Sequence, residues 1–154
     1  MKRLHLHITV PEIDKAVSFY NILFNQKADV EKADYAKWLL DDPAINFAIS
    51  TRGKSTGLNH LGFQVDDDES LAEITDRLQR AEFSGYAESE ANCCYAKSNK
   101  YWTRDPANIP WENFHTLGAI PVFGEDTQPS EGGTTTVAVE SNSQAENGSG
   151  RCCN

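Results

Sequence analysis

The chain has 154 residues, 39% hydrophobic and 24% charged, which is enough for one globular domain with a sizeable core. Its net charge of -9 repels phosphate backbones and argues against a nucleic-acid partner. No apolar run reaches the length of a membrane span, and the alternating N-terminus lacks the continuous apolar segment of a secretory signal. We therefore expect a cytoplasmic protein with no membrane partner.

The first half of the chain predicts the order β-α-β-β-β. A strand of alternating residues from Leu4 to Val10 leads to Pro11 and Glu12, which open a helix. An apolar stripe at helical spacing predicts that helix: Ile13, Ala16, Val17, Tyr20, Leu23 and Phe24. Short strands are predicted at residues 28–31, 35–40 and 45–50, with a turn at Asp41-Asp42-Pro43 between the last two.

The second half repeats this plan after a linker at residues 52–57. A strand at residues 58–65 leads to an acidic run at 66–69, which suits a helix N-terminus. The helix stripe consists of Leu71, Ile74, Leu78 and Ala81, and Gly85 is the predicted stop. Strands are predicted at residues 86–88, 95–103 and 110–114.

Residues 124–154 differ in composition from the rest of the chain. They are rich in Ser, Gly, Thr, Glu, Gln and Asn and contain no aromatic residue, so they bury too little apolar surface to offset their ordering entropy. We predict a disordered Ser/Gly/Thr-rich tail that ends in the pair Cys152-Cys153. In a reducing compartment this pair and Cys93-Cys94 are expected to be free thiols, available to soft metals or metalloids.

An internal repeat points to a metal site. The segments that begin at His5 and His60 both read His-Leu-x-apolar-x-Val-x-acid, which predicts two similar halves. Because side chains alternate along a strand, His5 and His7 share the more polar face of the first strand, and His60 lies on the more polar face of the second. Two histidines brought together by this pseudo-symmetry are half of a metal site. The alternative is a pair of polar surface histidines.

The third ligand is predicted on the last strand of the second half. Glu112 lies close to Trp111 and Phe114, where a carboxylate is costly to bury unless a metal or another cation pairs with it. Two neutral imidazoles and one carboxylate form the facial triad that suits Fe(II) and O₂ chemistry, although Zn²⁺, Mn²⁺ and Ni²⁺ accept the same ligands. The alternative is a rim carboxylate paired with a lysine or with Arg104. His115 falls on the opposite face and is left out.

The paired halves, His5 and His60, and the spacing Asp-Pro-x(5)-Glu before Glu112 resemble the vicinal oxygen chelate superfamily. That group includes glyoxalase I, extradiol dioxygenases, and the fosfomycin and bleomycin resistance proteins. The resemblance implies an α+β fold of two paired βαβββ modules, which form a curved mixed sheet around a metal-binding cleft. The domain would span residues 1–123, with halves at about 1–52 and 57–118. A homodimer is common in the superfamily, but the sequence shows no interface signature.

A narrower match involves residues 34–43, 45–50, 93–96 and 111–116. These segments are similar to the organoarsenical carbon–arsenic lyases and their relatives described as cadmium-induced proteins. The resemblance implies that His5, His60 and Glu112 hold a catalytic Fe(II), and that Cys93 and Cys94 bind the trivalent arsenic of the substrate. It also implies O₂-dependent cleavage of methylarsenite and trivalent aromatic arsenicals, with release of arsenite and thus arsenic detoxification.

The adjacent cysteines agree with such a substrate, because trivalent arsenic is soft and prefers sulfur. In a regular strand Cys93 and Cys94 point to opposite faces, so we predict a loop or bulge at residues 90–94, mobile and ordered by substrate. The alternative is a structural pair, since free cysteine often behaves as a small hydrophobe. Three nearby residues shape the pocket, lower the thiol pKa, or are solvated strand positions: Tyr95, Lys97 and Lys100.

Two other functions stay open from the sequence. A thiol-based protein could sequester Cd²⁺ or As(III) without catalysis, or the chain could be an extradiol-type dioxygenase that acts on a catechol. In the second case the cysteine pair would be incidental. His7 is interpreted as a polar residue that lines the cleft, with proton donation or substrate contact as the alternatives.

Overall fold

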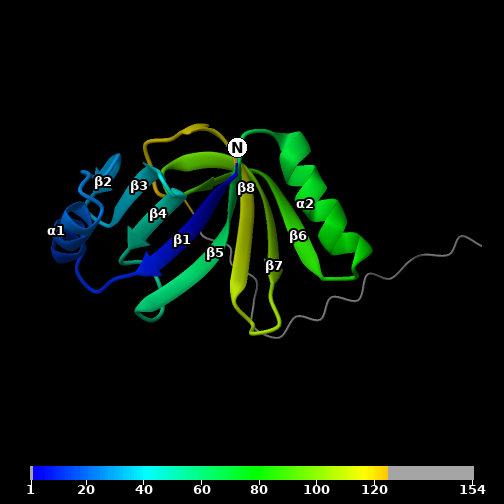
Figure 1. Ribbon diagram of the computed structural model, residues 1–154, viewed down its shortest axis with the longest axis horizontal. Coiled ribbons are helices and arrows are strands. Elements are labelled where there is room, and N and C mark those ends of the chain that lie inside the picture. Colours follow the sequence, from blue (N-terminus) through cyan, green and yellow to red (C-terminus); the bar gives the residue numbers. More distant parts are fainter. Residues whose placement is uncertain (1, 125–154) are drawn as a thin grey trace, which may run out of the picture.

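The computed structural model describes residues 2–124 (Figure 1). The predicted tail after Gly124, with Cys152 and Cys153, lies outside the described residues. The first module consists of β1 (Arg3–Thr9), α1 (Ile13–Leu23), β2 (Val30–Lys32), β3 (Tyr35–Asp41) and β4 (Ala44–Ser50). The second consists of β5 (Gly57–Val65), α2 (Asp68–Arg80), β6 (Gly85–Cys93), β7 (Ala96–Arg104) and β8 (Pro110–Ala119). Both modules have the predicted βαβββ order.

The strands form one eight-stranded sheet in the order β2-β3-β4-β1-β5-β8-β7-β6. The first strands of the two modules, β1 and β5, are antiparallel neighbours in its middle. The pairs β1–β4 and β5–β8 are parallel, and the other neighbours are antiparallel. In Figure 1 the curved sheet runs between α1 at one end and α2 at the other. The predicted α+β class with a mixed sheet is confirmed, and the sheet is not closed.

Helix α1 packs on the first module and forms the larger apolar core. Ile13 and Val17 of its predicted stripe are buried against Trp38 and Ile49, both of which are fully buried. Leu23, which the stripe included, is instead 60% exposed, because it lies at the margin of the stripe where the helix ends. Leu6 and Ile8 of β1 pack against the same core, so His5 and His7, which alternate with them, face the other side of the sheet.

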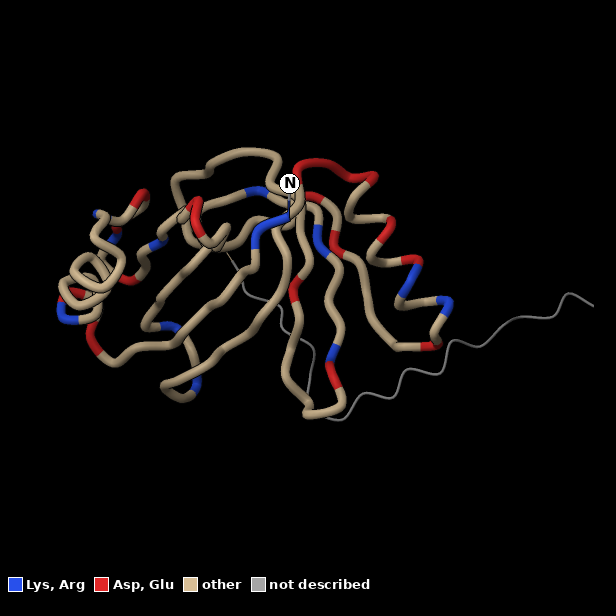
Figure 2. The backbone as a smooth tube through the Cα atoms, in the orientation of Figure 1, with Lys and Arg blue, Asp and Glu red and all other residues tan. Residues whose placement is uncertain are grey.

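Helix α2 begins and ends with favourable charges. The Asp67 side chain accepts a hydrogen bond from the Ser70 N–H, acidic residues occupy the first turn and basic residues the last, which suits the helix dipole. Figure 2 shows this change of sign along α2. The helix ends at Arg80, and Glu82 supplies the left-handed residue after it with φ 60°. The predicted stop at Gly85 is therefore wrong, because Gly85 begins β6.

The strands of the second module are longer than predicted. β6 continues to Cys93 and β8 to Ala119, because both pair with β7 along its length. These backbone hydrogen bonds form without the alternating apolar pattern from which strands are predicted. Of the predicted loop or bulge at residues 90–94, the loop is wrong over residues 90–93, which belong to β6, and the bulge is confirmed. A register shift between Glu88 and Ala91 supplies the irregularity, with Glu90 at φ 55°.

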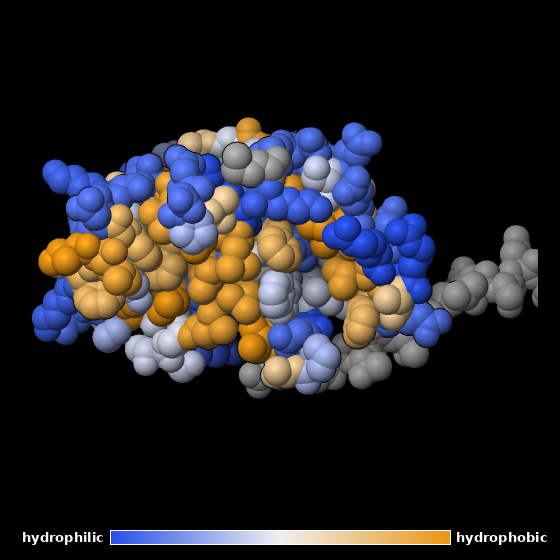
Figure 3. Space-filling model, in the orientation of Figure 1, coloured by the Kyte–Doolittle hydropathy of each residue, from blue (hydrophilic) through white to orange (hydrophobic). Residues whose placement is uncertain are grey.

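The side of the sheet that bears the helices is apolar at its centre. In Figure 3 hydrophobic side chains gather over β1 and β5, between the two helices. Because side chains alternate along a strand, the polar side chains of the central strands project from the other face, where the candidate site lies.

Within residues 2–124, neither helix is long and apolar enough to cross a membrane.

Candidate metal and thiol site

Three side chains from β1, β5 and β8 converge on the face of the sheet away from the helices. His5 Nε2 lies 3.1 Å from His60 Nε2 and 3.5 Å from Glu112 Oε2, and His60 Nε2 lies 3.2 Å from the same oxygen. Strand pairing explains this, because Gly62 is the partner of both His5 and Glu112 and His60 lies two residues away on the same face. All three side chains are buried. Their role as metal ligands stays a prediction, but the geometry it requires is present.

Gly62 allows this convergence, and the sequence pattern did not single it out. A Cβ atom at Gly62 would lie 1.6 Å from the backbone oxygen of Glu112. Any side chain there would push β8 away from β5 and move Glu112 from the histidines. The requirement depends on the spacing of two strands far apart in sequence, so no local signal reveals it.

Hydrogen bonds orient both imidazoles. His5 Nδ1 lies 3.0 Å from the backbone oxygen of Asn46, and His60 Nδ1 lies 2.8 Å from Asn59 Oδ1. Since both partners are acceptors, each Nδ1 carries the hydrogen and each Nε2 turns its lone pair toward Glu112. Burial, helped by the nearby His60, lowers the pKa of His5 from 6.5 to about 4, so its imidazole is neutral at pH 7. Two lone pairs and a carboxylate oxygen thus face one another, an arrangement that favours a cation among them.

The spacing of these three atoms fits one metal ion. Bonds of about 2.1 Å place neighbouring ligand atoms roughly 3.0 Å apart at right angles and roughly 3.4 Å apart at tetrahedral angles. The observed separations run from 3.1 to 3.5 Å. Two imidazoles and one carboxylate suit a divalent transition metal, and the ligand types alone do not choose among Fe(II), Mn²⁺ and Zn²⁺.

His7 lies beside this set. One ligand atom from each of His5, His7 and His60 falls within 4.8 Å of the others, so three histidines are also able to hold an ion. However, His7 Nε2 is 2.8 Å from Ser50 Oγ, and the atoms of the set with Glu112 are closer together. Burial, followed by the charges on His60 and His5, lowers the pKa of His7 well below its ordinary value. We keep the interpretation of His7 as a residue of the cavity wall.

Lys100 is the residue of the site that sequence reasoning undervalued. Its side chain is 6% exposed, and its Nζ donates to Glu112 Oε1 at 2.5 Å, so its interpretation as a solvated strand position is wrong. Burial alone would lower the pKa of Lys100, but the Glu112 charge raises it above its usual range. Burial alone would raise the pKa of Glu112, but Lys100 and the two histidines hold it well below its ordinary value. Lys100 thus occupies one carboxylate oxygen and leaves the other to the histidines.

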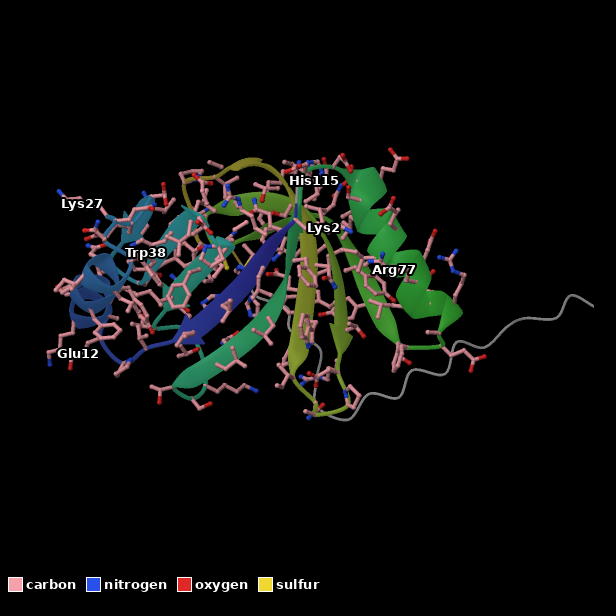
Figure 4. The ribbon with its side chains drawn as sticks, in the orientation of Figure 1. Lys2, Glu12, Lys27, Trp38, Arg77 and His115 are labelled. Carbon is pink, nitrogen blue, oxygen red and sulfur yellow. The ribbon has the colours of Figure 1, made fainter. Side chains whose placement is uncertain are left out.

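Two other residues considered from the sequence, Lys97 and His115, form ion pairs away from the cavity lining. Lys97 is 38% exposed and pairs with Glu90 at 2.9 Å, which makes it a solvated strand position. His115 Nδ1 lies 3.0 Å from Asp68 Oδ1, and Figure 4 shows His115 near the start of α2. Alternation along β8 had placed His115 on the face opposite Glu112, whereas the sequence left open whether Lys97 shapes the pocket. Lys100 shares the face of Glu112, because it lies two residues from Trp102, the partner of Glu112 on β8.

The thiols of Cys93 and Cys94 are free, and their Sγ atoms lie 2.8 Å apart. Cys93 pairs with Ala96 across the hairpin, so Cys94 and Tyr95 form a two-residue turn with φ angles of 56° and 61°. Two positive φ angles define the type I′ turn. The turn brings Cys94 back beside Cys93, which solves the problem of two adjacent side chains on opposite faces.

The thiols open on the same cavity as two of the predicted ligands, His5 and Glu112. It has about 400 Å³ of empty space, its mouth included, and its lining contains His5, His7, Cys93, Cys94, Lys100 and Glu112. The hydrogen bond with Cys93, burial and the neighbouring negative groups raise the pKa of Cys94 well above its ordinary value. A lowered thiol pKa, one of the alternatives for the residues near the cysteines, is therefore wrong for Cys94, because the second sulfur and burial outweigh the attraction of Lys100.

Comparison with known proteins identifies the family. Residues 2–113 match the model of the Glyoxalase/Bleomycin resistance protein/Dioxygenase superfamily. The chain belongs to this superfamily. A probable trivalent organoarsenical cleaving enzyme of Bacillus subtilis (strain 168) is 36% identical over 129 residues, which cover 82% of this chain and 88% of that protein. The cadmium-induced protein CadI of Mycobacterium tuberculosis (strain ATCC 25618 / H37Rv) is 30% identical over 125 residues, which cover 80% and 82%.

Solved structures of the superfamily share the fold. Homoprotocatechuate 2,3-dioxygenase from Brevibacterium fuscum superposes with a TM-score of 0.57 at 14% identity, over 77% of this chain and 37% of that one. The Mn(II)-bound glyoxalase from Novosphingobium aromaticivorans gives 0.55 at 12% identity, over 82% and 43%. The resemblance drawn from the sequence is thus confirmed at the level of the family, and the names of the family and its members indicate an enzyme.

Proposed function

We propose that this protein is a metal-dependent enzyme that cleaves the carbon–arsenic bond of trivalent organoarsenicals, with Fe(II) as the metal and O₂ as the second substrate. The observation that carries the proposal is a single cavity lined by the thiol pair and by two of the three predicted ligands, His5 and Glu112. A relative named for trivalent organoarsenical cleavage, 36% identical to this chain, supports the class of substrate. Methylarsenite and trivalent aromatic arsenicals are the expected substrates, and arsenite is the expected arsenic product.

The thiols would bind arsenic by exchange. An organoarsenous acid carries two hydroxyl groups and one carbon group on arsenic. Cys93 and Cys94 replace the two hydroxyls, so two As–O bonds break, two As–S bonds form, and the thiol protons leave with the hydroxyls as two water molecules. Neutral thiols are sufficient for this exchange, which agrees with the raised pKa of Cys94. The carbon group stays on arsenic, and Tyr35 and Phe114 of the cavity lining offer it apolar surface.

The chain positions both reactants in the same space. His5, His60 and Glu112 would hold the metal, which supplies reactivity toward O₂ when bound. Lys100 keeps Glu112 ionised and fixes one of its oxygens, so the other faces the histidines. Binding through two sulfurs restricts the substrate to one orientation relative to the ligands, which converts an encounter between free molecules into a positioned step.

An arsenic speciation experiment tests the proposal. The protein is loaded anaerobically with Fe(II), mixed with methylarsenite, and divided into samples with and without O₂. Arsenite is expected only when both iron and O₂ are present. Cys93→Ser and Cys94→Ser should lose this activity but keep their iron, whereas Lys97→Met on the exposed face should behave as the wild type. Full activity in both serine variants would remove the thiols from the mechanism.

Sequestration without catalysis is the second candidate. Two free sulfurs 2.8 Å apart suit a soft ion, and a relative 30% identical to this chain is named as a cadmium-induced protein. The same experiment separates the two functions. If the protein binds the arsenical tightly but releases no arsenite when iron and O₂ are present, its function is sequestration. The extradiol dioxygenase interpretation has the fold alone in its favour.

A further inference from the structure

The β6–β7 hairpin, which carries the thiols at one edge of the sheet, is hydrogen-bonded to the turn between β2 and β3 at the other edge. In strand order, β6 and β2 are the two edges of the eight-stranded sheet. Nevertheless, the Tyr95 hydroxyl in the β6–β7 turn donates to Asp34 Oδ1 at 2.7 Å, and Asp34 lies in the turn between β2 and β3. The curvature of the sheet therefore brings its two edges together beside the thiols.

The turn itself has little intrinsic preference for its conformation. A type I′ turn favours Asn-Gly, because both central residues need positive φ angles. Here the two positions are Cys94 and Tyr95, at φ angles of 56° and 61°. For a bulky residue such as tyrosine this backbone region is strained, so contacts with the surroundings must stabilise the turn.

Contacts from both modules brace the turn. Arg52 Nε donates to Asp34 Oδ2 at 2.6 Å, and its guanidinium lies 4.1 Å from the centre of the Phe123 ring. Phe123 is buried and packs edge-on against the Tyr95 ring at 5.7 Å between centres. The Ile120 N–H donates to the Tyr95 carbonyl at 3.0 Å. Tyr95 is thus held at its hydroxyl, its ring and its backbone.

We propose that Asp34 and Tyr95 are positioning residues for the thiol pair. Their contact, braced by Arg52 and here named the cross-module latch, holds the strained turn so that Cys94 stays beside Cys93 at the cavity. Without the latch the turn relaxes and the two sulfurs separate, so a trivalent arsenical is held by one sulfur for part of the time and dissociates faster. This inference rests on the proposed binding of arsenic by the thiols.

Two conservative variants of the full chain test the latch. Tyr95→Phe removes the hydroxyl but keeps the ring contacts, and Asp34→Asn removes the charge but keeps the shape. The control Glu90→Gln breaks the exposed pair between Glu90 and Lys97 on the same hairpin. The probe is phenylarsenous acid, and the measured quantities are its Kd and dissociation rate. Both variants should bind about three- to tenfold more weakly because they lose a hydrogen bond to a charged group, and the control should match the wild type.

Two further readouts separate positioning from a general loss of structure. In arsenite release, KM should rise while kcat stays within about twofold, because the latch does not touch the predicted ligands. The double variant should bind no more weakly than Tyr95→Phe, since without the Tyr95 hydroxyl no hydrogen bond is left for Asp34→Asn to weaken. Arg52→Gln, which loosens Asp34 without altering the turn, should weaken binding in the same direction if either conservative variant fails to fold.

Wild-type affinity in both conservative variants, additive losses in the double variant, or an equal loss in Glu90→Gln would overturn the inference. Failure of the proposed function looks different. In that case the wild type binds the probe through both thiols and the latch variants weaken this binding, but no arsenite is released with iron and O₂ present. The latch would then stand and the proposed lyase would not.

Discussion

Replacement of Lys100 by Met removes one member of a buried ion pair and leaves the other. The side chains of Lys100 and Glu112 are 6% and 7% exposed, and the atoms that join them lie 2.5 Å apart. Removal of one partner of such a pair costs about 3–5 kcal/mol, because the remaining charge is buried without compensation. We expect metal-free Lys100→Met to lose about 3 kcal/mol of unfolding free energy at pH 7, a large part of the 5–15 kcal/mol typical of a domain.

The loss should depend on pH in a defined direction. Without Lys100, burial is expected to raise the pKa of Glu112 above its value in the unfolded chain. A carboxyl group with a raised pKa in the folded state destabilises the fold as pH rises through that pKa. The difference between wild type and variant should therefore shrink as the pH is lowered from 7 toward 5. Urea denaturation in the presence of a chelator, followed by tryptophan fluorescence at each pH, measures both effects.

Lys97→Met is the matched control, since it is the same substitution on the same strand. Lys97 pairs with Glu90, but these side chains are 38% and 68% exposed, so the expected loss is below about 1 kcal/mol. Addition of Glu112→Gln to Lys100→Met should recover part of the loss, because no buried charge is then left alone. Equal and small losses for Lys100→Met and Lys97→Met would refute the reasoning.

Three further predictions follow from the ligand set. Gly62→Ala should cost about 2 kcal/mol or more and reduce iron content, because its Cβ would lie 1.6 Å from the Glu112 carbonyl; unchanged stability and iron content would contradict the strand spacing. The metal-free wild type should lose about 3 kcal/mol between pH 6.5 and pH 4, because the unfolded state binds the His5 proton at a higher pH than the folded state, whose pKa is about 4. Urea titrations in a chelator measure this loss, and a flat profile would argue against a buried neutral His5. His60→Ala should reduce bound Fe(II) to about a tenth or less, while His115→Ala keeps it, as measured by elemental analysis; equal retention in both would exclude His60 as a ligand.

The residues of the predicted ligand set could be chosen from the sequence because the signals for the two histidines are local. Alternation along a strand placed His5 and His60 on the polar face, and the repeat predicted that the two first strands are equivalent. Glu112 followed from the cost of a carboxylate among aromatic residues and from the resemblance. The structure brings these side chains to within 3.5 Å of one another, so the sequence was sufficient for their convergence.

The tertiary structure alone decided what depends on the spacing between strands and on the curvature of the sheet. Lys100 looked like any lysine on a polar strand until its pairing beside β8 placed its ammonium on Glu112. Glycine is needed at position 62 because the backbone of Glu112, 50 residues away in the chain, lies against it in the folded sheet. The two sulfurs meet at the turn between β6 and β7, whose Tyr95 donates a hydrogen bond to Asp34 from the other edge of the sheet. A sequence pattern reports which face a side chain takes, but only the curved sheet determines which side chains on that face come into contact.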